Sequence, residues 1–289
     1  MTYWSMTNIS TGNFTNISVE HIPAIELDAF NFLSEWIITY TGLHFPKNKE
    51  ISLYRRLSSL ALRLGMFDLN EMVLHLKMKD RPDLPSEIAR TISTNHSFFF
   101  RELEVLQFFH DHIIPTLPAE PSWRIWSAAA AGGEEAYTLA IILAEAIGLK
   151  QAIHQVSILG TDISYPMISN AEDGIYHKQK LEMVDASILK RYFRPDKEDH
   201  MAISPAIKPM CTFRRINLNR VPWPFQNMFH VIFCRNVLYY FDRPTQEELV
   251  ERFYDVTLPG GWMVTSVTES LYWAKTRWRP VTTGVYRKI

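Results

Sequence analysis

A loop of small residues between an apolar run and a helical pattern constrains the fold of this chain more than any other feature. The apolar run Trp123 to Trp126 enters the stretch Ser127 to Glu135, which reads Ser-Ala-Ala-Ala-Ala-Gly-Gly-Glu-Glu, and a helix-like pattern follows. A strand, a tight turn and a helix in this order form the first unit of nucleotide-binding α/β folds, where small residues let the backbone approach a ligand closely. The sequence therefore predicts an α/β fold with a ligand at this turn.

The two carboxylates at the end of the loop restrict the kind of ligand. Glu134 and Glu135 stand where a pyrophosphate would have to lie, so phosphate is a poor candidate. A ligand with an ammonium group, a ribose and no phosphate suits the loop better, and S-adenosylmethionine (SAM) is the common cofactor of that description. On this segment alone, an Ala/Gly turn with two solvated glutamates at a helix start is an equally good interpretation.

A second acid follows about one strand–helix unit later. The run Val156 to Thr161 ends at Asp162, where such folds place a carboxylate on the ribose hydroxyls. An aspartate after a strand is also an ordinary helix N-cap. Apolar runs at 228–234, and at 262–267 after the turn Pro259-Gly260-Gly261, predict further strands that complete a parallel sheet.

Composition excludes several classes of protein. With 30 Lys and Arg against 31 Asp and Glu, the chain has no broad basic surface, so we expect no nucleic-acid partner. No apolar run reaches the roughly 18 residues of a membrane span, so we expect a cytoplasmic protein without direct membrane insertion. The triplet His110-Asp111-His112 lacks a third ligand at suitable spacing, and we expect no metal.

The chain divides into three parts. Residues 1–19 read as a flexible tail, residues 20–93 as a helical domain with helices at 25–40, 47–64, 69–79 and 85–92, and residues 94–289 as the α/β domain, with an insertion at about 185–215. The second helix carries Lys47, Lys49, Arg55, Arg56 and Arg63 against Glu50. This run is either a solvated face or a surface for an acidic helical partner.

Five segments together match, in order, the motifs of a known family. They are Thr-Asn-His-Ser-Phe-Phe-Phe-Arg-Glu at 94–102, Trp-Ser-Ala-Ala with Gly-Glu-Glu at 126–135, Thr-Asp-Ile at 161–163, Asn-Leu at 217–218, and Phe-Cys-Arg-Asn-Val-Leu-Tyr-Tyr-Phe-Asp at 233–242. With these segments the chain resembles the CheR family, the chemoreceptor glutamate methyltransferases. The resemblance implies an all-α N-terminal domain, a class I SAM-dependent methyltransferase (Rossmann-like) domain and a small antiparallel β-subdomain, which the insertion fits.

The resemblance also implies a set of site residues. Glu135 would hold the methionine end of SAM, Asp162 would accept from the ribose hydroxyls, and Asn217 would bond near the adenine. Arg101 and Tyr240 would lie by the reacting methyl group and the incoming carboxylate, as the catalytic pair. The full set of positions that the resemblance implies for SAM, and for its product S-adenosylhomocysteine (SAH), is Asn95, Ser97, Arg101, Glu135, Asp162, Asn217, Leu218, Arg235 and Asn236.

The implied substrate is the glutamate side chain of a chemoreceptor or a similar coiled-coil signalling protein, methylated during chemotactic adaptation. Arg55, Arg56 and Arg63 would face it, although Ser58-Ser59-Leu60 interrupts the arginine-rich stretch of the family. The segment after Phe193 is short and lacks glycine, so we expect no docking of a receptor C-terminal pentapeptide. The alternatives are a SAM- or SAH-binding scaffold without receptor methylation, and methylation of RNA or a small molecule.

Overall fold

The computed structural model describes residues 21–45, 49–92, 97–119 and 122–289. The tail predicted at 1–19 and the predicted cofactor residue Asn95 lie outside the described residues. Among the described helices, none combines the length and the apolar content needed to cross a bilayer.

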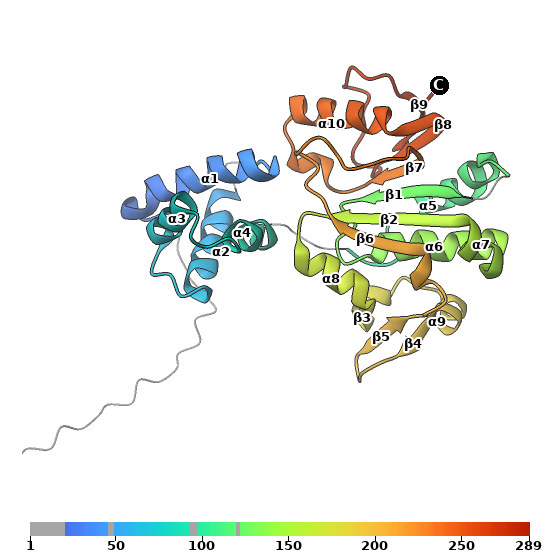
Figure 1. Cartoon of the computed structure of the whole chain (residues 1–289), viewed down its shortest axis with the longest axis horizontal. Helices are drawn as coiled ribbons and strands as arrows, with labels where there is room; N and C mark the ends of the chain where they lie inside the picture. The colour runs from blue at the N-terminus through green and yellow to red at the C-terminus, as the bar shows by residue number, and fades with distance from the viewer. Residues whose placement is uncertain (1–20, 46–48, 93–96, 120–121) are drawn as a thin grey trace, which may run out of the picture.

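The N-terminal domain is all-α, as predicted. A short 3-10 turn (Ala24–Glu26) precedes the helices α1 (Leu27–Thr41), α2 (Glu50–Arg63), α3 (Leu69–Met78) and α4 (Leu84–Ile92). Apolar side chains at helical spacing, such as Leu33 and Ile37 on α1 and Leu53 and Leu57 on α2, are buried between them. Figure 1 shows these helices gathered beside the α/β domain.

The α/β domain is built on a seven-stranded sheet with the order β6-β2-β1-β7-β8-β10-β9. Its strands are β1 (Trp123–Ala128), β2 (Val156–Asp162), β6 (Cys211–Arg215), β7 (Phe229–Cys234), β8 (Thr257–Val264), β9 (Arg279–Thr282) and β10 (Val285–Arg287). The strands β6, β2, β1, β7 and β8 pair in parallel, whereas β10 is antiparallel to both of its neighbours. The sheet is therefore mixed, and the prediction of a parallel sheet holds only for its first five strands in spatial order.

The turn predicted at Pro259-Gly260-Gly261 lies inside β8. A Cβ on Gly261 would approach the carbonyl oxygen of His230 to 2.9 Å, so glycine allows β7 and β8 to pair closely here. The C-terminal hairpin of β9 and β10 closes through Gly284, whose φ of 74° suits a tight turn. The residues at 259–261, which are typical of turns, are thus part of a strand that pairs with β7.

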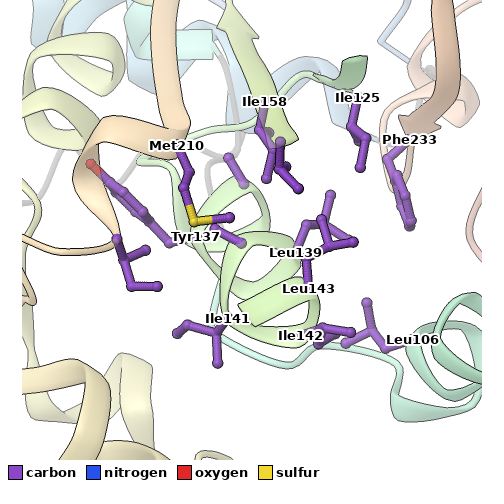
Figure 2. Packing of buried hydrophobic residues seen from close by; sticks show 14 of the residues in the cluster. Leu106, Ile125, Tyr137, Leu139, Ile141, Ile142, Leu143, Ile158, Met210 and Phe233 are labelled. Carbon is purple, nitrogen blue, oxygen red and sulfur yellow. The ribbon is translucent and has the colours of Figure 1, made fainter. Parts of the chain in front are cut away.

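Helices cover both faces of the sheet. The segments before and after β1 are α5 (Leu103–Phe108), a π-helical turn (Phe109–Ile113), a 3-10 turn (Ile114–Thr116), α6 (Glu134–Ile147) and α7 (Leu149–Gln155). Later come α8 (Tyr165–Asp173), α9 (Ala186–Tyr192), the 3-10 helix η7 (Leu238–Tyr240) and α10 (Arg243–Asp255), with two further 3-10 turns, η5 (Lys178–Leu181) and η6 (Lys208–Met210). Figure 2 shows side chains of α6, among them Leu139 and Leu143, directed at Ile125 and Phe233 of the sheet.

The opposite face of the sheet joins the core of the helical domain. Trp126, one residue along β1 from Ile125, packs in the cluster that contains Phe253 of α10 and the buried leucines of α1 and α2. Successive residues of β1 are buried on opposite faces, as expected for a central parallel strand that is covered on both sides. The helical domain thereby meets the α/β domain at the carboxyl ends of β1, β2 and β7.

The β-subdomain is a separate antiparallel sheet with the order β3-β5-β4, formed by β3 (Ile175–His177), β4 (Phe193–Pro195) and β5 (His200–Ile203). Its strands thus span 175–203, whereas we predicted about 185–215. The last residues of the predicted range form β6, which pairs in parallel with β2 at the edge of the main sheet. Short apolar runs give no indication of their partner strand, which explains the displaced boundary.

Candidate functional site

An open cavity lies where β1, β2 and β7 end and the helical domain meets the sheet. It encloses about 1040 Å³, counting its solvent-filled mouth. The helical domain contributes Thr41, Leu43 and Ile92 to its wall. The predicted site residues that line it are Ser97, Arg101, Glu135, Asp162, Asn217, Leu218, Arg235, Asn236 and Tyr240. The structure therefore brings nearly all of the predicted set together at one cavity.

The small-residue loop after β1 forms the base of this cavity. Ala129 and Ala131 adopt left-handed backbone conformations, with φ of 64° and 47°, and Gly133 has φ of 89°. A Cβ on Gly133 would lie 2.8 Å from the Cβ of Ala171, so only glycine fits there. The loop is anchored on β2, because Ala130 N–H donates to the carbonyl oxygen of Thr161 at 2.8 Å.

Asp162 is buried at the end of β2. Its Oδ2 accepts from Ala131 N–H at 3.0 Å and its Oδ1 from Ser164 N–H at 2.8 Å. Burial raises the pKa of this carboxyl to about 6, and these two hydrogen bonds oppose that rise because they stabilise the ionised form. Each oxygen keeps a further lone pair, so ligand hydroxyls can donate to it as well. Asp162 thus supports the start of α8 and also presents a carboxylate to the cavity.

Glu135 and Arg235 form a buried ion pair beside the loop. Arg235 Nη1 lies 3.1 Å from Glu135 Oε2, and the arginine side chain is only 3% exposed. Ser127 Oγ donates to the other carboxylate oxygen of Glu135 at 2.7 Å. Burial raises the pKa of Glu135, and the charge of Arg235 opposes that rise. The pair fixes one wall of the cavity and presents an acid to it.

Sequence reasoning assigned no role to Glu102 and Glu269, which hold this wall in place. Glu102 lies 3.3 Å from Arg235 Nη2 and accepts from Asn236 Nδ2 at 2.9 Å. Glu269 accepts from the N–H groups of Asn236 at 2.6 Å and Tyr239 at 3.3 Å. Burial raises the pKa of Glu269, and these backbone donors oppose the rise. Asp162 ends the buried strand β2, and Glu269 follows the buried end of β8 by a few residues; an acid near the end of a buried strand is a signal that could have identified Glu269.

Asn217 joins the two domains. Its Nδ2 donates to the carbonyl oxygen of Tyr40 at the end of α1, and its Oδ1 accepts from Asn219 N–H at 2.9 Å. The adjacent Leu218 is buried and lines the cavity. The structure thus uses the Asn217 amide at the domain junction, and its predicted contact near an adenine stays a prediction.

Tyr240 and Arg101 lie on the cavity wall near one arginine of α2. Burial raises the pKa of the Tyr240 phenol, and the positive charges of Arg56 and Arg101 oppose that rise. Arg56 also donates from Nη1 to the carbonyl oxygen of Ile92 at 3.3 Å, which ties α2 to α4. The exposed Arg63 pairs with Glu87 on α4 at 3.5 Å. Arg56 is therefore a predicted substrate arginine whose positive charge acts on Tyr240.

The chemistry of the cavity fits SAM. Asp162 offers acceptors for ribose hydroxyls, Glu135 offers an acid to an ammonium group, and Arg101 offers a cation to a carboxylate. Leu43, Leu218 and neighbouring apolar residues suit a flat base. Among the residues that the structure describes, no group of His, Cys, Asp and Glu is arranged to hold a metal ion.

Comparisons with known proteins identify the family of both domains. The model of the CheR methyltransferase SAM-binding domain matches residues 95–286, and that of the CheR methyltransferase all-alpha domain matches residues 28–93. A chemotaxis protein methyltransferase of Borreliella burgdorferi is 31% identical over 235 residues, which cover 79% of this chain and 83% of the relative. Chemotaxis protein methyltransferase 2 of Pseudomonas aeruginosa is 32% identical over 262 residues, which cover 89% and 91%.

These matches extend over both domains. The all-α domain and the α/β domain correspond to the two matched models in chain order. SAM is therefore the cofactor of this protein. The chain belongs to the CheR methyltransferase family.

Proposed function

We propose that this protein transfers the methyl group of SAM to glutamate side chains on the cytoplasmic helices of a chemoreceptor, forming glutamyl methyl esters and SAH during chemotactic adaptation. The observation that carries the proposal is that Arg101 and Tyr240 line the cavity together, with the positive charge of Arg56 acting on the Tyr240 phenol. Two cations and a phenol hydroxyl provide the donors and the charge that a carboxylate substrate needs. The names of the chemotaxis relatives support the chemoreceptor as partner.

The residues of this site orient the substrate, and the methyl transfer itself needs no general base. A glutamate side chain has a reference pKa of about 4.3 and is ionised near neutral pH. When bound, SAM supplies a methyl group on a positively charged sulfur, which a carboxylate oxygen accepts without losing a proton. Arg101 and the Tyr240 hydroxyl hold the carboxylate, and the walls formed by both domains restrict its approach. Rate enhancement here is mainly a matter of proximity and orientation.

The decisive experiment is incubation with tritiated SAM and candidate receptor cytoplasmic domains. A glutamyl ester is hydrolysed in mild base, whereas methyl groups on nitrogen persist. We expect label on the receptor fragment that is released as methanol by alkali. Label that withstands alkali, or label in RNA, would contradict the proposal, and an absence of transfer with intact SAH binding would favour the scaffold alternative.

We expect Asp162→Ala to weaken SAM and SAH binding about 10- to 100-fold, because a charged acceptor for the ribose is lost. Calorimetry with SAH measures this directly. Since burial raises the pKa of Asp162 to about 6, its ionised, accepting form is lost as the pH falls through 6. SAH affinity should therefore fall about tenfold from pH 7 to pH 5, if ionised Asp162 is required.

Asp162→Asn is the control for this pH dependence, because it keeps the shape of the side chain and does not titrate. Its SAH affinity should be low and nearly constant between pH 5 and pH 7. A wild-type affinity that is constant over this range, or an unchanged affinity in Asp162→Ala, would remove Asp162 from the ribose site.

We also propose that a receptor C-terminal tether contributes little. Pentapeptide docking on a sheet edge needs a strand with free backbone donors and acceptors. The edge strand β4 has three residues, and the last, Pro195, has no N–H to donate. Deleting the last residues of a receptor should change its methylation rate less than about twofold, which is no more than the net contribution of one weak hydrogen bond. A large loss of rate on truncation would show that this edge does dock a tether.

A further inference from the structure

Two consecutive tyrosines of η7 place their hydroxyl groups side by side. The Tyr239 and Tyr240 rings stand 4.3 Å apart between centroids with an interplanar angle of 45°, and the Tyr239 hydroxyl donates to that of Tyr240 at 3.3 Å. Tyr240 lines the cavity, whereas Tyr239 is 54% exposed. The pair therefore extends from the cavity wall towards solvent.

The backbone under this pair is held rigidly. Glu269, which is buried, accepts from the N–H groups of both Asn236 and Tyr239. The carbonyl oxygen of Tyr240 accepts from His44 N–H at 2.6 Å, which joins η7 to the segment after α1 in the helical domain. Because the turn is anchored on both sides and the two hydroxyls bond to each other, the pair is ordered before a ligand binds, and this reduces the entropy lost on binding.

The charges near the pair favour an anion. The guanidinium groups of Arg56 and Arg101 both act on the Tyr240 phenol. Arg101 is also stacked near Phe98, with its Cζ 5.7 Å from the ring centroid, and its Nε lies 3.9 Å from Glu102. The acids of this region, Glu102 and Glu269, are engaged with Arg235, Asn236 and backbone donors. An incoming carboxylate thus meets hydroxyl donors and cations.

We propose that Tyr239 is a second substrate-contacting residue, whose hydroxyl binds the acceptor carboxylate beside that of Tyr240. This inference rests on the proposed function and adds to it a residue that receives the substrate. Two hydroxyls 3.3 Å apart on one side of a carboxylate can donate in parallel to its two oxygens, as the two N–H groups of an arginine fork do. The hydrogen bond between the two phenols is then replaced by one bond from each phenol to the substrate.

The two hydroxyls have different tasks. Tyr240 is half-buried beside Arg101, so it acts where the reacting oxygen lies. Tyr239 is more exposed and reaches the carboxylate from the solvent side, so its bond stabilises bound substrate and transition state alike. Loss of such a uniform interaction raises KM for the acceptor and leaves kcat nearly unchanged.

The test compares Tyr239→Phe with Tyr272→Phe, a control on another exposed tyrosine, which lies between β8 and β9 and not on η7. Phenylalanine keeps the ring and removes only the hydroxyl. For a receptor helical fragment, Tyr239→Phe should raise the acceptor KM about 3- to 10-fold, with kcat within about twofold and SAH affinity unchanged. Tyr272→Phe should leave all three quantities unchanged.

Binding of the fragment to the SAH-saturated protein gives a readout without turnover. The wild type should bind the Glu-bearing fragment more tightly than its Glu→Gln form, and Tyr239→Phe should reduce that preference. An unchanged acceptor KM and an unchanged preference would overturn the inference. The proposed function fails separately, if the wild-type protein makes no base-labile ester on any receptor fragment.

Discussion

Replacing Arg235 by methionine is expected to lower the free energy of unfolding by about 3–5 kcal/mol, because the change leaves buried carboxylates without their cation. Arg235 is 3% exposed and lies between Glu135 at 3.1 Å and Glu102 at 3.3 Å. It also donates to the carbonyl oxygen of Arg101. Denaturant titration followed by circular dichroism measures the loss, and SAH binding should weaken with it, since the cavity wall depends on this pair.

Arg191→Met is the matched control. Arg191 pairs with Glu145 at 2.7 Å, but half of its side chain is exposed, so we expect a loss of only about 0–1 kcal/mol. If Arg235→Met and Arg191→Met lost equal stability, the buried network would not have the structural role inferred here. The loss of stability in Arg235→Lys should lie between the losses in these two variants, since lysine keeps the charge and lacks the forked geometry of arginine.

The sequence predicted the parts of the site that depend on local pattern. The strand–loop–helix around Ala129 and Gly133 and the acid at Asp162 both lie at strand ends, where period and residue type are informative. The helical domain could be predicted equally well, because the apolar spacing of α1 to α4 is regular. These elements fixed the nucleotide fold and the position of the cavity.

The parts that could not be predicted depend on partners far apart in the chain. The Asn217 amide bonds to the carbonyl oxygen of Tyr40, 177 positions earlier, and neither residue signals the other. Sequence alone could not show that β6 joins β2 or that β10 runs antiparallel to β8, because short strands carry no information about their neighbours. Likewise, the sequence pattern of α2 does not distinguish Arg55, Arg56 and Arg63. In the structure, Arg56 bonds to Ile92 of α4 and its charge acts on Tyr240, whereas Arg63 pairs with Glu87.

The network behind the site also explains why the motif 233–242 carries Arg235 and Asn236 directly after a buried strand. Asn236 has a φ of 59° and Glu102 a φ of 56°, both in the left-handed region, and each bonds to the other through its side chain. Such conformations are costly for residues with side chains and persist where surrounding contacts enforce them. Here they turn the chain so that Arg235 points to Glu135 and η7 presents Tyr240 to the cavity.

Tyr240→Phe is expected to lower the single-turnover rate of methyl transfer about 10- to 100-fold, while SAH affinity stays within about threefold. The hydroxyl orients the acceptor at the moment of transfer and adds little to ground-state binding of the cofactor. Arg101→Ala should lower the rate further, on the order of 10²- to 10³-fold, because a charge-assisted contact with the carboxylate is lost. It should also weaken SAH, since this guanidinium lines the same cavity.

Single-turnover rates and equilibrium SAH binding have to be measured side by side on the same preparations, with Tyr272→Phe as the control that leaves both unchanged. Separate effects on rate and affinity distinguish a catalytic group from a cofactor-binding group. Equal losses of rate and SAH affinity in Tyr240→Phe would contradict a catalytic role for Tyr240. If the unmutated protein bound SAH through Asp162 and Glu135 yet transferred no methyl group to any receptor helix, the same cavity would instead serve a SAM-binding scaffold.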